Sequence, residues 1–187
     1  RGLECAVYSG NSPNDKFQKV LSFSKNDLSH ADEVVSIEGV SLIRNPKNEC
    51  GYEFFISTEK KKAYPKTLIN FQKPGTGVWS IDLLQAENGI ESFNLKQIET
   101  IARSEHGSTL HYKDPVVFNS ENTDTHVIFC HHPFSWSSSN SGLLTRTNNS
   151  KNFHLISENI LSRGNSWDVA CARVTEKLSI PKIGHFA

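Results

Sequence analysis

Tyr52-Glu53-Phe54-Phe55-Ile56-Ser57-Thr58 is followed directly by a Lys-rich turn, and Ser141-Gly142-Leu143-Leu144-Thr145-Arg146-Thr147 is followed by an Asn-rich turn. Each run is typical of a strand that leads into a polar hairpin tip, because aromatic and β-branched residues favour extended backbone. The two runs lie roughly 90 residues apart, about two units of the size of a propeller blade. This echo predicts repeated antiparallel β-units.

Similar short strand patterns recur along the chain, separated by turns rich in Gly, Asn, Ser and Pro. They cover residues 39–43, 52–57, 78–84, 115–119, 126–130, 142–146, 152–156 and 168–175. Helical periodicity is weak, and residues 95–104 are the one stretch that could form a short helix. We therefore predict an all-β fold of β-propeller-like antiparallel blades, with about three blades, too few to close a ring. Residues 1–187 form a single β-rich domain in this prediction, and residues 1–29 can serve as an irregular lead-in.

Charge and hydropathy exclude two classes of partner. The 187 residues carry 20 Lys plus Arg and 20 Asp plus Glu, so no basic excess favours nucleic acid. No apolar run approaches the roughly 20 residues of a membrane helix, and the N-terminus lacks a signal-peptide pattern, so we expect a soluble chain without a membrane partner. Because the chain contains no Met, even at position 1, we expect it to belong to a longer product.

The four cysteines, Cys5, Cys50, Cys130 and Cys171, form no Cys-x-x-Cys pair and have no zinc-type Cys/His spacing. The sequence therefore predicts neither a metal nor another cofactor. Two disulfides, in any of three connectivities, and buried free thiols both remain compatible with this spacing.

Two strand entrances carry a carboxylate. Glu38 precedes Gly39 and an apolar strand, and a glycine there permits close backbone approach, so Glu38 could face a central cavity. Asp114 precedes Pro115, which favours an extended conformation in the residue before it and would hold Asp114 at the strand mouth beside Lys113. The alternatives are an ordinary surface Glu and an Asp that caps a turn.

A third cluster combines aromatic, imidazole and small polar side chains between residues 130 and 173. Such a set suits a carbohydrate subsite, because aromatic faces stack on sugars and short polar groups bond hydroxyls. The alternative is a Ser-rich loop with two core tryptophans. The candidate ligand-binding residues are His132, Trp136, Asn140, Trp167 and Arg173. His131 and His132 could ligate a metal only with a bend at Pro133, since neighbouring strand residues point to opposite faces.

These motifs resemble those of the five-bladed β-propeller glycoside hydrolases. The matching features are Glu38-Gly39, Lys113-Asp114-Pro115, the loop at residues 136–142, and Trp167-Asp168. The resemblance implies Asp114 as a central carboxylate and Glu38 as a general acid. It leaves Asp32 and Asp168 as candidates for the catalytic base.

We therefore expect a carbohydrate-active protein that cleaves a glycosidic bond with paired carboxylates, drawn from Glu38, Asp114 and Asp168. The main alternative is a non-catalytic β module in which the region of Trp136 and Trp167 holds a glycan or a partner chain. A metal-dependent hydrolase that uses His131 or His132 is a third hypothesis. Unpaired sheet edges would also permit self-association, or a partner chain that completes the sheet.

Overall fold

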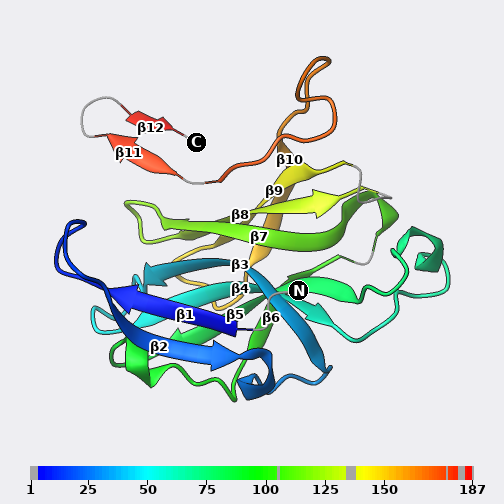
Figure 1. Ribbon diagram of the computed structural model, residues 1–187. Coiled ribbons are helices and arrows are strands. Elements are labelled where there is room, and N and C mark those ends of the chain that lie inside the picture. The colour runs from blue at the N-terminus through cyan, green and yellow to red at the C-terminus, as the bar shows by residue number, and fades with distance from the viewer. Residues whose placement is uncertain (1–3, 105, 134–137, 176, 181–183, 187) are drawn as a thin grey trace.

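The computed structural model describes residues 4–104, 106–133, 138–175, 177–180 and 184–186 (Figure 1). The fold is all-β, as predicted, with two four-stranded and two two-stranded antiparallel sheets. The helical segments of the described residues are single 3₁₀ turns at the strand connections. They are η1 (Lys25–Asp27), η2 (Ile69–Phe71), η3 (Ile90–Ser92) and η4 (Gly107–Thr109).

Both four-stranded sheets are meanders, in which strands that follow one another along the chain also pair in the sheet. The first sheet contains β3 (Val34–Arg44), β4 (Tyr52–Lys60), β5 (Val78–Ala86) and β6 (Glu99–Arg103). The second contains β7 (Leu110–Asn119), β8 (Thr125–His132), β9 (Asn140–Arg146) and β10 (His154–Leu161).

A two-stranded hairpin of β1 (Glu4–Ser9) and β2 (Gln18–Ser24) occupies the segment that we expected as an irregular lead-in. It lies against the first sheet on the side away from the second sheet. A second short hairpin, of β11 (Leu178–Ile180) and β12 (Gly184–Phe186), follows near the end of the chain, on the far side of the second sheet in Figure 1.

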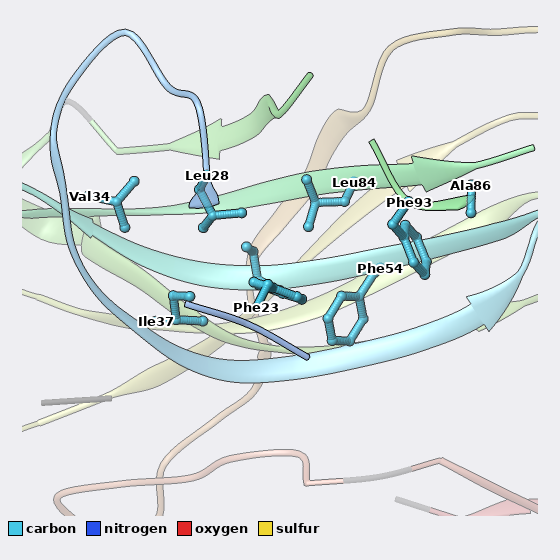
Figure 2. Packing of buried hydrophobic residues seen from close by; sticks show 9 residues of the cluster. Phe23, Leu28, Val34, Ile37, Phe54, Leu84, Ala86 and Phe93 are labelled. Atoms are coloured by element: carbon cyan, nitrogen blue, oxygen red, sulfur yellow. The ribbon is translucent and has the colours of Figure 1, made fainter. Parts of the chain in front are cut away.

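The first sheet is buried on both faces, by the β1–β2 hairpin on one side and by the second sheet on the other. Successive side chains of a strand point to opposite sides, so neighbouring residues enter different cores. Phe54 packs between the first sheet and the β1–β2 hairpin, with its ring 6.0 Å from Phe23 and 5.8 Å from Phe93 (Figure 2). Phe55, its neighbour, belongs to a separate core between the two large sheets, where it joins Val127 and Phe129. This double burial explains why residues 52–58 form a nearly continuous apolar run rather than a clean alternation.

The structure differs from the sequence analysis in three places. Residues 95–104 contain a turn and strand β6 instead of a helix, because the apolar pair Ile101 and Ala102 packs into the core between the sheets. Residues 168–175 form turns and a single bridge at Cys171 instead of a strand. The structure contains two four-stranded sheets and not three, and the two echoed runs occupy β4 and β9, which are the second and third strands of their sheets.

Candidate functional site

The first strands of the two large sheets meet at Gly39 of β3 and Asp114 of β7. The pairing register shifts at both places, next to Glu38 in β3 and next to Lys113 in β7, so each strand is bulged at the contact. Gly39 and Asp114 both have positive φ angles, of 49° and 53°. A Cβ atom on Gly39 would lie 2.5 Å from Asp114 Oδ1, so only glycine permits this approach.

Local bonding fixes the unusual backbone at Asp114. Its backbone N–H donates to Ser57 Oγ on β4 at 2.8 Å, outside the ladder of its own sheet. Pro115, which follows, has no N–H to place in the ladder and suits a bulge for this reason. A non-glycine residue with positive φ is strained, and such residues concentrate at functional sites, which makes this crossing the leading candidate site.

Each carboxylate at the crossing is paired with a cation. Lys113 Nζ donates to Glu38 Oε2 at 2.7 Å and lies 4.0 Å from the centre of the Trp79 ring. Arg173 Nη1 donates to Asp114 Oδ2 at 3.2 Å. The Glu38 and Asp114 side chains are 37% and 40% exposed, so both carboxylates remain open to a ligand.

A buried thiol lies beneath Asp114. Cys130 on β8 is 3% exposed, and its Sγ donates to Asp114 Oδ2 at 3.2 Å. Burial, and secondarily the negative charge of Asp114, raises the pKa of the Cys130 thiol to about 12. Cys130 therefore stays a neutral thiol at physiological pH and serves Asp114 as a hydrogen-bond donor rather than as a nucleophile.

Two buried imidazoles border the same cluster. Burial, together with nearby cations, lowers the pKa of His132 to about 4 and that of His111 to about 3. Their rings lie 6.4 Å apart, and the His111 ring lies 5.3 Å from that of Tyr64, whose hydroxyl accepts the backbone N–H of His111. His111 also has a positive φ of 60°. Both histidines are neutral at pH 7.

The structure brings together four of the residues that the sequence singled out. Glu38, Asp114, His132 and Arg173 all contribute to the cluster at the crossing of β3 and β7.

The other candidates lie elsewhere or outside the described residues. Asp168 accepts the backbone N–H of Gly164 within a local turn, at 3.0 Å, and Trp167 beside it is 92% exposed. Asp32 pairs with Lys62 at the start of β3. Asn140 lines a separate cavity of about 430 Å³, and Trp136 lies outside the residues that the structure describes.

Sequence reasoning missed four residues that support the site, namely Ser57, Trp79, Cys130 and Ser139. Ser57 is a polar residue in the middle of an apolar strand, which is a usable signal for a buried hydrogen bond. Trp79 and Ser139 carry no comparable signal, because each contacts the site only through a residue far away in the chain.

A second charged cluster lies inside the first sheet. Lys60 Nζ donates to Asp82 and to Ser80 Oγ, and both charged side chains are at most 3% exposed. Burial lowers the pKa of Lys60, and Asp82 opposes this shift. Thr58 and Thr100 also donate to Asp82. This pair is enclosed and fully bonded, so it stabilises the sheet and offers no group to a ligand.

Metal and disulfide chemistry find little support. Within the described ranges, no group of three or more His, Cys, Asp or Glu side chains could hold a metal ion. All four cysteines are free thiols, but the expectation of buried thiols holds for Cys130 alone, since Cys50 and Cys171 are exposed and Cys5 is half-buried. His131 and His132 point to opposite sides, toward Glu158 and Arg173, as expected for neighbours on a strand.

Among the described residues, no helix has the length and apolar character needed to cross a membrane. A cavity of about 590 Å³ lies at the far end of β4, lined by Glu59, Lys61 and Gln72 among others. It is separate from the carboxylates at the crossing.

The chain matches no protein-family model, and a search of curated proteins found no match to it.

Proposed function

We propose that the chain provides two adjacent blades of a β-propeller whose first strands present Glu38 and Asp114 to a carbohydrate. The two meander sheets, which pack face to face through Phe55 and Phe129, support the propeller arrangement. The carrying observation is the contact between Gly39 and Asp114, which joins the carboxylate-bearing bulges of two separate sheets at one place.

The chemistry of the cluster suits a polyhydroxylated ligand. Carboxylate oxygens accept hydrogen bonds from sugar hydroxyls, and the Lys113 side chain can donate to those hydroxyls. Because the pairs are partly exposed, a ligand can exchange its own hydroxyls for part of these contacts at modest cost.

The favoured activity is hydrolysis of a glycosidic bond by two carboxyl groups. Asp114 acts as the ionised partner in this proposal, because the Arg173 guanidinium stabilises its negative charge. Glu38 acts as the general acid, which requires a proton on its carboxyl group. Lys113 Nζ donates to Glu38 Oε2, so the substrate has to displace Lys113 before Glu38 can donate a proton to the leaving group.

A second candidate, a non-catalytic carbohydrate-binding module, is favoured by this same ion pair. A Glu38 that stays paired with Lys113 meets a sugar as a hydrogen-bond acceptor and not as a proton donor. The site would then recognise a sugar without cleaving it.

The test uses Glu38→Gln and Asp114→Asn, with Glu121→Gln as a matched control in the exposed turn after β7. A panel of aryl glycosides measures turnover, and NMR titration with the corresponding free sugars measures affinity. For a hydrolase, we expect both site variants to lose at least about 100-fold in kcat, with smaller changes in affinity, and the control to match the wild type.

For a binding module, the wild type would show no turnover, and Asp114→Asn would weaken sugar binding. A wild-type protein that neither hydrolyses nor binds any sugar of the panel would contradict the proposed function.

A further inference from the structure

The two oxygens of the Asp114 carboxylate have different surroundings. Oδ2 accepts hydrogen bonds from Cys130 Sγ and Arg173 Nη1, both at 3.2 Å. Oδ1 lies next to Gly39 and accepts no hydrogen bond from the residues that the structure describes. One oxygen is thus fixed by the protein, and the other is left for a donor from outside.

The guanidinium of Arg173 contacts an acceptor with each of its three nitrogens. Nη1 donates to Asp114 Oδ2, and Nε donates to Ser139 Oγ at 2.8 Å. Nη2 lies 3.4 Å from His132 Nε2. The planar guanidinium of Arg173 is therefore oriented by groups from three different parts of the second sheet.

The ring of His132 is in the form that accepts a hydrogen bond from Arg173. Its Nδ1 lies 2.8 Å from the carbonyl oxygen of Ser138, which can only accept, so Nδ1 carries the proton. Nε2 is then the acceptor. The lowered pKa of His132 keeps the ring neutral at pH 7, which preserves this acceptor.

The backbone around Arg173 is anchored to the start of β9. The backbone N–H of Ser139 donates to the carbonyl of Ala170 at 3.0 Å, and Ser141 Oγ donates to the carbonyl of Ala172, also at 3.0 Å. A parallel bridge joins Ser139 to Cys171. These contacts attach residues 170–173 to the second sheet and deliver the Arg173 side chain to Asp114.

We propose that Arg173 is a positioning residue, which fixes Asp114 Oδ2 so that Oδ1 faces the ligand. Its own orientation is set by Ser139 and His132. This inference rests on the proposed function and changes the role of Arg173, which acts through Asp114 instead of bonding the sugar directly. A sugar hydroxyl is the expected donor to Oδ1.

A lysine cannot take over this role. An ammonium group retains the positive charge beside Asp114. It has one nitrogen atom, however, and cannot donate to Asp114, Ser139 and His132 at once as the planar guanidinium does. Charge alone and oriented bonding therefore predict different outcomes for a lysine substitution.

The experiment compares Arg173→Lys and Arg173→Gln with Arg163→Lys, a matched control at a half-buried arginine whose guanidinium donates to the nearby backbone carbonyl of Val169. NMR follows the Asp114 Cγ and His132 Nε2 resonances without ligand. We expect both resonances to shift in Arg173→Lys nearly as far as in Arg173→Gln, and to stay unchanged in the control. With a sugar substrate, we expect kcat to fall at least about tenfold in Arg173→Lys with KM within about threefold.

Ser139→Ala is a second variant that leaves Arg173 in place and removes the acceptor of Nε. We expect it to shift the same two resonances in the same direction by a smaller amount. Wild-type resonances in Arg173→Lys, or full kcat in that variant, would overturn the positioning role.

The NMR arm needs no substrate, so it separates the two proposals. If no sugar binds or reacts while the resonances respond as expected, the proposed function fails and the fixing of Asp114 by Arg173 stands.

Discussion

At the scale of single residues, the site depends on histidines that are buried in the neutral form. His111 is fully buried and His132 is 4% exposed, and burial lowers the pKa values of both below the ordinary histidine value of 6.5. In the unfolded chain both histidines bind a proton near pH 6.5, whereas in the folded protein they do so only near pH 3 to 4. The two histidines therefore do not reduce the free energy of unfolding above pH 6.5, and they lower it as the pH falls below that value, because the unfolded chain then binds more protons.

We predict a loss of stability between pH 7 and pH 5, to which each histidine contributes about 1 to 2 kcal/mol. His111→Gln should remove its share, so the difference in unfolding free energy between the two pH values should shrink by that amount. Urea unfolding at pH 7, 6 and 5 measures it. His154→Gln, at an exposed position on β10, is the control for replacing an imidazole outside the core. An undiminished pH dependence in His111→Gln would contradict the prediction.

Sequence motifs identified part of the site at this scale. Glu38 and Asp114 were singled out as carboxylates at strand entrances, but both lie inside their strands, at bulges. The extended conformation expected for Asp114 before Pro115 was wrong, because the bulge gives Asp114 a positive φ. Trp79 and Ser139 were missed, since their contacts with Lys113 and Arg173 depend on packing between distant strands. A short sequence motif can indicate unusual backbone, but it cannot indicate which distant side chains will be in contact.

At the scale of strands, a buried ion pair ties the two large sheets together. Arg146 of β9 donates to both carboxylate oxygens of Glu53 on β4, at 2.9 and 2.7 Å, and also to Thr125 on β8. The side chains are 7% and 1% exposed. The Arg146 guanidinium also lies 4.8 Å from the centre of the Phe153 ring. Strand β9 is thereby attached to the first sheet by a buried ion pair.

We predict that Glu53→Gln destabilises the protein by about 3 to 5 kcal/mol, because it leaves the Arg146 charge buried without its partner. The double variant Glu53→Met with Arg146→Met should lie within about 2 kcal/mol of the wild type, since it removes both charges. Denaturant unfolding measures all variants. Glu33→Gln, which breaks an exposed pair with Lys61, should cost less than about 1 kcal/mol. A loss for Glu53→Gln as small as that of Glu33→Gln would show that the buried pair adds little.

The strand pattern was largely predictable, and its failures have a common cause. Most of the strands in both large sheets carry β-branched and aromatic runs that the sequence displays openly. Residues 168–175 have a similar composition, and yet only Cys171 pairs, because the segment is occupied by a turn around Asp168 and by the anchoring of Arg173. Propensity describes what a segment can form, and tertiary contacts decided otherwise here.

At the scale of the whole molecule, the outer edge of the second sheet pairs with no further strand among the described residues. β10 is an edge strand, and its exposed apolar residues include Ile156 at 60% and Leu155 at 46%. An open edge with apolar side chains is a template for another strand. The exposed edge supports the expectation of self-association or of a partner strand.

We predict that the chain associates through β10 at concentrations of about 100 µM, and that Ile156→Lys combined with Ile160→Lys restores the monomer. Size-exclusion chromatography with light scattering, over a dilution series, measures the mass. Ile69→Lys, at an exposed apolar site in η2, is the control and should associate like the wild type. A wild-type chain that stays monomeric throughout the series would refute this prediction.

The meander order of the two large sheets has a consequence for biosynthesis. Every strand pair within β3–β6 forms between consecutive segments, so this sheet can assemble on the ribosome before β7 has emerged from the exit tunnel. The contact of Asp114 with Ser57 and Gly39, and the bonds of Arg146 to Glu53, can form only after the second sheet has emerged. The carboxylate site is thus among the last features to be completed during synthesis. A nascent chain that stops before β7 has the first sheet but lacks Asp114 and its partners.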